Sequence, residues 1–512
     1  MCGIVGMFGS SQELVLERML EVTAHRGEDS TRYRFWDGTC GLGINRLSIV
    51  DLERGEQPLK NERGDVFVVC NGEIYNHAAI RADLEARHAL GTFSDAQVLP
   101  GLYDDHGKDC VAFLDGMFGF VLYDSKKRTF LAARDPLGIK PLYYVHDDGR
   151  WLFASEAKAL LEGGVDPRLV RLLPPGHRLT PEDGVERYYV PPAHKSVPNP
   201  ELLRALLDHA VKKRLMADVE VGTFLSGGID SSIVTALAAK YLPNVQAFTV
   251  GMEGSPDVEA ARLVADHLGI RHHVRTFTRE EMLELLPEAI WHVESYNPSM
   301  VTGSVVTLMG AKLAKEHGVK VVLCGEGADE ILAGYLVLRD LGPDELERSS
   351  RTLMDNLHKT ELQRLDRMSM AVSLEARVPF LDRSVVEYAL NLPHSAKIHE
   401  DGDKRIEKHL LRQAFDGMLP DEILWREKMP FDQGSGGRTL IEFVNEQVSD
   451  DELAAAQREA PEANLVSKEM LYYYRIWRER FGEMGGGRRF ELFGDYPGMM
   501  HRIRERTAKS GS

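Results

Sequence analysis

A proline-rich segment divides the sequence into two parts with different hydrophobic patterns. Residues 189–200 contain four prolines in twelve positions. Proline lacks a backbone N–H and disfavours helix interiors and central strands, so this composition is typical of a linker. We therefore expect one domain at residues 1–190, a linker at residues 191–200 and a second domain at residues 201–512.

The first domain has the pattern of a β-rich fold. Short runs of β-branched and aromatic residues recur between Gly, Asp and Pro turn signals, which is typical of strands. Helical spacing interrupts these runs, notably at residues 13–23 and 77–86. The expected strands are residues 4–8, 66–70, 118–123, 130–133, 142–145 and 151–154.

The second domain alternates strand and helix patterns. Buried strands are expected at residues 219–225, 245–250 and 319–323, with helices at residues 233–241 and 258–268. Such alternation predicts βαβ units and a parallel sheet, so the fold class is α/β. Towards the C-terminus the spacing becomes mostly helical.

Composition excludes several classes of protein. Lys and Arg total 62 and Asp and Glu total 79, so the net charge of −17 disfavours broad binding to nucleic acid or anionic membranes. The sequence contains no apolar stretch long enough for a transmembrane helix, and its start lacks the basic and apolar regions of a secretory signal. The five cysteines are widely spaced, which indicates reduced thiols in a cytoplasmic protein.

The second residue is a candidate nucleophile. A small residue at position 2 permits removal of the initiator Met, which would leave Cys2 with a free α-amine. An α-amine has a pKa of about 7.7–8, so at neutral pH it can accept the proton of the thiol and activate it. A cysteine near a chain end is by itself more often a small apolar residue, and neighbouring polar motifs therefore decide between the two interpretations.

Several polar residues follow expected strands of the first domain. An amino-acid amide substrate needs an Arg for its carboxylate, acids for its ammonium and N–H donors at the carbonyl under attack. Arg46, Glu73 with Asp95, and Asn71 with Gly72 meet these needs. Each residue taken alone is more often structural, so the prediction depends on their combination.

The strand at residues 219–225 leads into a glycine-rich loop. The sequence SGGIDSS, residues 226–232, places two glycines, three hydroxyls and Asp230 at the start of a helix. Free N–H groups at a helix start bind phosphate, and a nearby Asp can hold Mg²⁺. A Walker A pattern is missing here. The ordinary alternative is a capped βα turn, which does not explain why all these groups converge.

A second acidic loop follows the strand at residues 319–323. Ligands of open α/β sheets bind at the carboxyl ends of the strands, so this loop and the glycine-rich loop can share one nucleotide. Glu326 is then placed to act as a general base or to orient an amine, and Asp329 as a second Mg²⁺ ligand. The ordinary alternative is a capped helix start.

The first domain closely resembles class II glutamine amidotransferase domains. The motifs that carry this resemblance are MCGIVG, His25-Arg26-Gly27, residues 46–51, residues 71–76, Ser94-Asp95 and residues 134–138. It implies an Ntn-type α/β/β/α sandwich that hydrolyses glutamine, with Cys2 as nucleophile and Asn71 with Gly72 as oxyanion hole. Glu28 and Gln97 depart from the usual pattern without removing a catalytic group. The implied glutamine-binding residues are Arg46, Leu47, Ser48, Ile49, Val50, Asn71, Gly72, Glu73 and Asp95.

The glycine-rich loop resembles the pyrophosphate-binding loop of the ATP pyrophosphatase superfamily. These enzymes have a Rossmann-like domain and cleave ATP between the α and β phosphates, and they include tRNA-thiolating, GMP-forming and NAD-forming members. The resemblance implies Asp230 and Asp329 as Mg²⁺ ligands. The implied ATP-binding residues are Phe224, Leu225, Ser226, Gly227, Gly228, Asp230, Ser231, Ser232, Val250, Cys324 and Gly325.

The combination of both domains resembles the glutamine-hydrolysing asparagine synthetase family. Residues 369–382, 407–412 and 425–431 of the largely helical C-terminal part also resemble that family. It implies a carbon–nitrogen ligase that uses glutamine, aspartate and ATP with Mg²⁺. Cys2 would release ammonia, which would cross an internal tunnel to β-aspartyl-AMP, and Lys428 would stabilise the charge of the adenylation step. Family members often dimerise, and neither a nucleic acid nor a membrane partner is expected.

The acceptor remains open between two alternatives. Thr302 stands where several bacterial members have an Arg, so the chain either amidates another carboxylic acid or replaces this cation by a neighbouring one such as Lys428. β-Lactam-forming relatives are disfavoured because they usually lack the cysteine nucleophile. A non-catalytic scaffold is disfavoured because Cys2, Asp230 and Glu326 are all retained.

Overall fold

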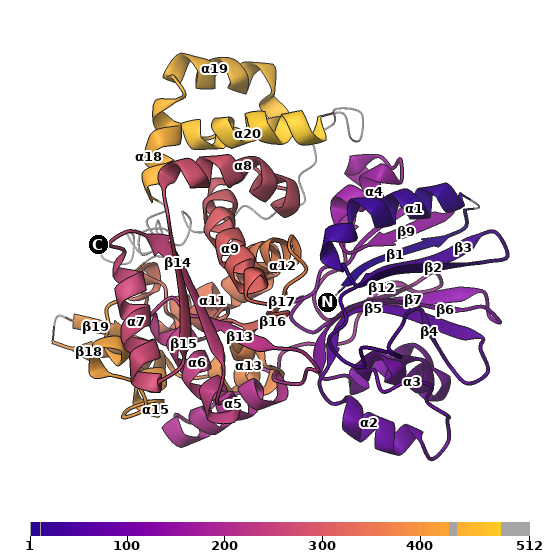
Figure 1. The fold of residues 1–512 in the computed structure, drawn as a ribbon, viewed down its shortest axis with the longest axis horizontal. Helices are drawn as coiled ribbons and strands as arrows, with labels where there is room; N and C mark the ends of the chain where they lie inside the picture. Colours follow the sequence, from indigo (N-terminus) through magenta and orange to yellow (C-terminus); the bar gives the residue numbers. More distant parts are fainter. Residues whose placement is uncertain (1, 11, 403, 430–437, 483–512) are drawn as a thin grey trace.

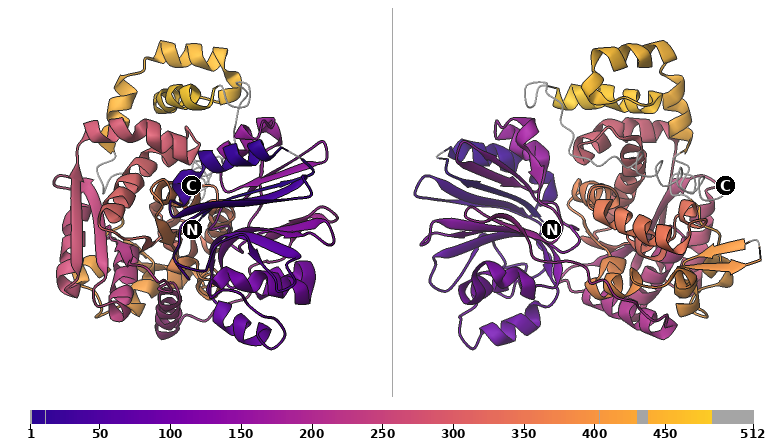
Figure 2. Two further views of the ribbon diagram at one scale, coloured as in Figure 1. Left: turned by 45° about the vertical axis from the view of Figure 1, so that its right-hand side comes forward. Right: turned by 180° about the vertical axis from the view of Figure 1, so that it is seen from behind.

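The chain folds into two α/β halves that face each other along one boundary (Figure 1). The computed structural model describes residues 2–10, 12–402, 404–429 and 438–482. Residues 430–431 of the C-terminal motif and residues 483–512 of the expected second domain lie outside the described residues. Both views in Figure 2 keep the start of the chain at the boundary between the halves.

The N-terminal half contains two six-stranded antiparallel sheets. The first has the order β10-β8-β9-β1-β3-β2 and the second the order β12-β11-β7-β6-β5-β4. The strands of the first sheet are β1 Cys2–Phe8, β2 Ser30–Trp36, β3 Cys40–Arg46, β8 Tyr143–Asp147, β9 Arg150–Ala154 and β10 Arg171–Leu172. Those of the second are β4 Leu59–Lys60, β5 Val66–Ile74, β6 Gly116–Asp124, β7 Thr129–Arg134, β11 His177–Thr180 and β12 Gly184–Arg187.

Apolar side chains from both sheets meet in a shared core. Ile4 and Ile44 of the first sheet form one buried cluster with Val69 and Val121 of the second. Side chains alternate between the faces of a strand, so the opposite faces must be covered by helices. Helices α1 (Glu13–Val22) and α4 (Ala157–Glu162) cover the first sheet, while α2 (His77–Leu84) and α3 (Val98–His106) cover the second (Figure 1). The predicted α/β/β/α sandwich is confirmed.

The C-terminal half is built on a five-stranded parallel sheet with the order β15-β14-β13-β16-β17. From β13 the chain adds β14 and β15 on one side and then β16 and β17 on the other, so the strand order changes direction between β13 and β16, the position where open α/β sheets bind ligands. The predicted Rossmann-like parallel sheet is therefore confirmed. Its strands are β13 Val221–Phe224, β14 Gln246–Met252, β15 Arg271–Phe277, β16 Val321–Leu323 and β17 Glu375–Arg377.

The helices of the C-terminal half confirm its predicted helical character. Those between or beside the sheet strands are α5 Pro200–Lys213, α6 Ile229–Tyr241, α7 Pro256–Leu268, α8 Arg279–Val293, α9 Pro298–Glu316, α10 Ala328–Leu332, α11 Pro343–Leu357 and α12 Glu361–Met370. Later elements are α13 Arg383–Ala389, α14 His394–Lys397, β18 Ile398–Asp401, β19 Lys404–Glu407, α15 His409–Ala414, α16 Asp421–Leu424, α18 Arg438–Glu446, α19 Asp450–Glu459 and α20 Lys468–Phe481. No helix in the described ranges is long and apolar enough to cross a membrane.

The expected linker is held against α13. The backbone carbonyl of Asn391, just after α13, accepts a hydrogen bond from the Ser196 amide at 3.0 Å. The Asn391 side chain donates to the carbonyl of Pro192 at 2.9 Å. The Tyr388 hydroxyl donates to the carbonyl of Val197 at 2.9 Å. These bonds fix a segment whose prolines cannot join a sheet or a helix interior.

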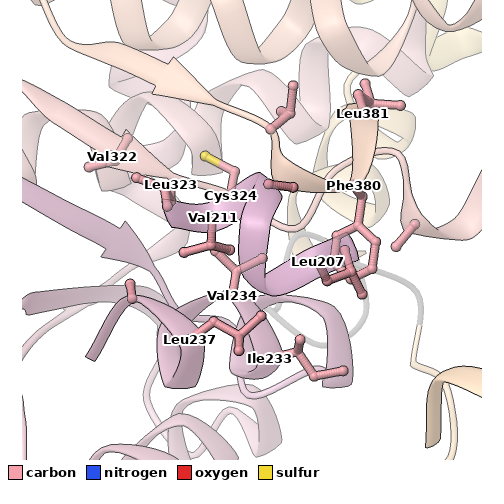
Figure 3. Close-up of a cluster of buried hydrophobic side chains, with 14 of the residues drawn as sticks. Leu207, Val211, Ile233, Val234, Leu237, Val322, Leu323, Cys324, Phe380 and Leu381 are labelled. Carbon is pink, nitrogen blue, oxygen red and sulfur yellow. The ribbon is translucent and has the colours of Figure 1, made fainter. Parts of the chain in front are cut away.

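A buried cluster packs α5 and α6 beneath the nucleotide-side strand β16 (Figure 3). Leu207 and Val211 of α5 contribute to this cluster, as do Ile233, Val234 and Leu237 of α6. The helix spacing of these residues places them on one face.

Leu207→Ala is expected to lower the free energy of unfolding by about 2–5 kcal/mol, because it leaves a cavity in this cluster. Leu207 is fully buried, whereas Leu202 on the same helix is 42% exposed. Leu202→Ala is the matched control and should change stability by less than about 0.5 kcal/mol. Denaturant unfolding followed by far-UV circular dichroism tests both variants, and equal effects would contradict the assigned packing.

Candidate active sites

Cys2 begins β1 and lies opposite Arg46 of β3 at the boundary between the halves. The residue is 5% exposed. Burial raises the pKa of its thiol, while the N-terminal charge, a backbone hydrogen bond from Leu47 and the Arg46 guanidinium act in the opposite direction. A buried thiol in this position needs a nearby base to form the reactive thiolate.

The Cys2 nitrogen is anchored by the Asn71 side chain. It donates to Asn71 Oδ1 at 3.0 Å. Because Met1 precedes Cys2 in the sequence, this nitrogen is an amide, and removal of Met1 would convert it to the expected α-amine. The other end of the same side chain, Asn71 Nδ2, is buried without a hydrogen-bond partner among the described residues. It is a donor available to a developing oxyanion beside the thiol.

The close approach of strand β6 leaves room only for glycine at position 72. Its φ of +143° is unfavourable for residues with a side chain, and a Cβ here would lie 1.9 Å from the carbonyl oxygen of Met117. Asn71 and Gly72 therefore occur together because β5 supplies the amide side chain and the close approach of β6 permits only glycine after it.

Arg46 holds the following loop rather than standing free. Its guanidinium donates to the carbonyls of Val50 at 3.3 Å, Asp51 at 2.8 Å and Leu52 at 3.3 Å. The Ser48 amide donates to Asp29 Oδ2 at 2.7 Å, which fixes the other side of the loop. The loop from Leu47 to Val50 is thus held beside Cys2, and direct binding of a glutamine carboxylate by Arg46 stays a prediction.

Glu73 and Asp95 place two carboxylates at the same end of β5. Glu73 is 3% exposed and Asp95 is 5% exposed. Burial raises the pKa of both, and Glu375 of β17 raises that of Glu73 further. Asp95 Oδ2 accepts the amide of Ile74 at 2.6 Å, whereas Glu73 Oε2 is without a hydrogen-bond partner among the described residues. An ammonium group would pair with Glu73 here.

The glycine-rich loop joins β13 to α6. Gly227 has a φ of +72°, and a Cβ at this position would lie 2.6 Å from the Cβ of Ala260, so only glycine fits. The Ser226 amide donates to Ser231 Oγ at 3.1 Å, and Ser232 Oγ donates to the carbonyl of Gly228 at 2.8 Å. These bonds hold the loop around the start of α6, where free amides attract anions.

A cavity of about 720 Å³ opens in front of this loop. Gly227, Ser232 and Cys324 lie outside its lining. Cys324 is 1% exposed and its side chain lies in the buried cluster of Figure 3, and its contact with a nucleotide stays a prediction. The expected residues that line the cavity are Phe224, Leu225, Ser226, Gly228, Asp230, Ser231, Val250, Gly325, Glu326, Asp329 and Lys428.

Lys408 is a functional candidate that the sequence motifs did not identify. Its Nζ lies 2.5 Å from Asp230 Oδ2 and 2.6 Å from Asp329 Oδ1, between the two expected Mg²⁺ ligands. Lys428 Nζ lies 2.7 Å from Asp329 Oδ2. Lys408 has a φ of +56°, a strained conformation for a residue with a side chain. A Cβ at Gly334 would lie 2.1 Å from Lys408 Cε, so Gly334 provides the space for this lysine.

The two lysines control ionisation at this end of the cavity. Burial opposes the charge on Asp329, but Lys408 and Lys428 hold its pKa well below its usual range. Asp230 Oδ1 is buried without a hydrogen-bond partner among the described residues. Two carboxylates with an unpartnered oxygen suit a hard cation such as Mg²⁺. The described residues contain no cluster of three or more metal-ligating side chains.

Two further acidic side chains, Glu326 and Glu330, line the cavity. Burial raises the pKa of Glu326, and Arg364 partly offsets this effect. Burial and Asp329 raise the pKa of Glu330 to about 8, although its carboxylate accepts a hydrogen bond from the Tyr335 hydroxyl at 2.6 Å. A carboxyl that retains its proton near neutral pH can exchange protons in a reaction at this pH.

Thr302 lines the same cavity, and two side chains hold it there by hydrogen bonds. Its hydroxyl donates to Glu469 Oε1 and also lies within hydrogen-bond distance of the Tyr473 hydroxyl, with both distances 3.1 Å. Next to it, a Cβ at Gly303 would lie 2.6 Å from Arg364 Nη1. Arg364 therefore supplies a cation beside Thr302, while Lys428 lies with Asp329.

Comparisons with known proteins match both halves. The family profile described as "Asparagine synthase" matches residues 202–342 and 339–482, and the "Glutamine amidotransferase domain" profile matches residues 1–173. Asparagine synthetase [glutamine-hydrolyzing] 2 of Arabidopsis thaliana is 39% identical, over 94% of this chain and 87% of that protein. The chain belongs to the glutamine-hydrolysing asparagine synthetase family.

Other relatives agree with this membership. Asparagine synthetase B [glutamine-hydrolyzing] of Escherichia coli K12 is 36% identical, over 94% of this chain and 91% of that protein. A solved glutamine phosphoribosylpyrophosphate amidotransferase from B. subtilis is 17% identical and covers 63% of this chain and 81% of its own, with a TM-score of 0.33. That value is too low to support an argument. Membership in the synthetase family accounts for both candidate sites in one chain.

Lys408→Met is expected to lower the free energy of unfolding at neutral pH by about 3 kcal/mol, because it removes the cation between the half-buried carboxylates of Asp230 and Asp329, of which only Asp329 keeps a second lysine, Lys428. The pKa of Asp329 is lowered in the folded state, so this contribution is present above its unfolded value of 3.8 and is lost as the pH falls through the folded value. Unfolding at neutral and acidic pH tests this dependence. Exposed Lys404 of β19 provides the control variant Lys404→Met, and equal losses for both variants would contradict the prediction.

Proposed function

We propose that this protein synthesises asparagine from aspartate, with ATP as the energy source and glutamine as the nitrogen donor. The observation that carries the proposal is the presence of two complete constellations in one chain. Cys2 with Asn71 lies at the boundary between the halves, and the loop after β13 opens into a cavity that contains Glu326 and Lys428. A volume of about 720 Å³ falls within the usual range for sites that hold a nucleotide or substrate.

In the first half-reaction, the Cys2 sulfur attacks the side-chain carbonyl of glutamine. The α-amine formed on removal of Met1 takes the thiol proton and passes it to the departing ammonia. Asn71 Nδ2 and the backbone of Gly72 stabilise the oxyanion, while Glu73 pairs with the substrate ammonium. Water then releases glutamate from the thioester, and ammonia moves towards the second half through the interior, which keeps it unprotonated.

In the second half-reaction, the aspartate side-chain carboxylate attacks the α-phosphorus of ATP and pyrophosphate leaves. Ser226, Ser231 and the start of α6 bind the leaving phosphates, and Lys408 and Lys428 stabilise the negative charge that develops there. Asp230 and Asp329 would hold Mg²⁺, which neutralises phosphate charge when it is bound. Ammonia attacks the resulting acyl adenylate, Glu326 accepts its proton, and asparagine and AMP are released.

Cys2→Ala is expected to abolish glutamine-dependent synthesis, by about 10⁴-fold or more, and to preserve ammonia-dependent synthesis. The reason is that only the first half-reaction needs the thiol. Asparagine and pyrophosphate are measured with glutamine or with ammonium chloride as the nitrogen source. Cys40→Ala is the matched control, because Cys40 is a free thiol at the far end of β3. Absence of asparagine from both nitrogen sources in the unmodified protein would refute the proposal.

A second candidate function is amidation of another carboxylic acid at the same cavity. Thr302 favours it, because its hydroxyl binds Glu469 and Tyr473 in place of the cation present in several relatives. A carboxylate at this wall favours an acceptor that carries a positive charge there. In the main proposal, Arg364 supplies the missing cation instead.

Pyrophosphate release with a panel of amino acids and small carboxylic acids distinguishes these functions. We expect aspartate to give the highest kcat/KM. Thr302→Val should raise the KM for the acceptor about 5-fold without changing the KM for glutamine, because it removes two hydrogen bonds from the cavity wall, each worth about 1 kcal/mol. Release of pyrophosphate only with an acid other than aspartate would support the second candidate.

A further inference from the structure

Arg377 extends from β17, at the edge of the parallel sheet, into the glutamine site of the other half. The side chain is fully buried. Its Nη2 lies 3.4 Å from Glu73 Oε1, and its Nε donates to Glu375 Oε1 at 2.5 Å. Its Nη1 donates to the carbonyls of Arg214 at 2.5 Å and Met216 at 2.7 Å. The guanidinium is thus fixed from the C-terminal half and presents one edge to Glu73.

Glu73 needs a cation to remain charged in this position. Burial raises its pKa, and both Glu375 and Asp95 raise it further. Arg377 acts in the opposite direction, together with the N-terminal charge. Other titratable groups near it are Cys70 of β5 and Tyr75, which follows β5. Arg377 is therefore the side-chain cation that opposes two carboxylates around Glu73.

The backbone of the same residue holds the loop of the second active site. The carbonyl of Arg377 accepts the amide of Cys324 at 2.9 Å, and Arg377 lies opposite Leu323 in the parallel pair of β16 and β17. Cys324 begins the loop that carries Gly325 and Glu326 into the nucleotide cavity. One residue therefore contacts the carboxylate of the glutamine site through its side chain and the nucleotide loop through its carbonyl.

We propose that Arg377 is a positioning residue that holds the Glu73 carboxylate towards the ammonium of glutamine, and that it makes glutamine affinity depend on occupancy of the nucleotide cavity. This inference rests on the proposed glutaminase function of Cys2. Movement of the Cys324 loop on nucleotide binding is transmitted along β17 to the guanidinium, and from there to Glu73. Coupling of this kind is reciprocal, so glutamine also strengthens nucleotide binding.

Steady-state glutaminase kinetics from about pH 5.5 to about pH 9 test the proposal in the full-length protein. Arg377→Met should raise the KM for glutamine about 10-fold or more and leave kcat within about 3-fold, because a charge-assisted contact that orients Glu73 is lost. The acid limb of kcat/KM should move to higher pH, since Glu73 then binds a proton more readily. Arg377→Lys should restore part of both effects.

The coupling is measured by repeating the assay with ATP and aspartate present. These substrates should lower the KM for glutamine in the unmodified protein and have less than about a 2-fold effect in Arg377→Met. Arg383→Met is the matched control, because Arg383 is 46% exposed on the adjacent helix α13 and pairs with Glu387. It should behave like the unmodified protein in every assay.

Several outcomes would overturn the proposal. An unchanged KM and acid limb in Arg377→Met would exclude a positioning role, provided that ammonia-dependent synthesis shows an intact fold. An equal nucleotide effect in both proteins would refute the coupling. Lack of glutaminase activity in the unmodified protein would instead refute the proposed function.

A second variant covers the case in which Arg377→Met does not fold. Glu73→Gln should remove the acid limb assigned to Glu73. Adding Arg377→Lys to Glu73→Gln should then raise the KM for glutamine no further, because the two residues act through one contact. Additive effects of the two substitutions would contradict the proposal.

Discussion

Charged side chains buried between the two halves are the interaction on which the rest of the structure depends. Arg26 of the N-terminal half is fully buried and binds Glu156 at 2.8 Å within its own half and Asp366 of α12 at 2.9 Å in the other. Arg367, the next residue of α12, donates to the carbonyl of Ser155 at 2.9 Å. Loss of one partner from such a pair would cost about 3–5 kcal/mol, so the halves remain joined.

This joint lies beside Cys2, because Arg26 Nε also donates to the carbonyl of Cys2 at 3.2 Å. Cys2 begins β1 at the boundary, and Glu73 receives its cation from β17 of the opposite half. The free-energy cost of burying these charges is offset only when every partner is in place. The arrangement of the glutamine site therefore depends on the fold of the second half.

The sequence predicts a feature accurately when the cause of that feature lies within one short stretch of residues. Strands such as β5 and β14 are apolar enough to be predicted from their residues alone. β15, with the sequence RHHVRTF, and the three-residue β17 have no such signal, because pairing with β14 and β16 creates them. Likewise, Asn71 and Gly72 were predicted from a motif, whereas Lys408 and Gly334 became evident only from their distance to Asp329.

The sequence by itself determined the α/β class and the family and predicted the two-domain division and the candidate residues, because hydrophobic spacing and contiguous motifs express local requirements of the chain. Only the tertiary structure decided which charges meet. Arg377 follows Glu73 by about three hundred residues in the chain, and Lys408 follows Asp230 by 178 residues. Their pairing depends on burial and strand order rather than on sequence spacing, since a buried charge is stable only beside an opposite charge that the fold has brought to it.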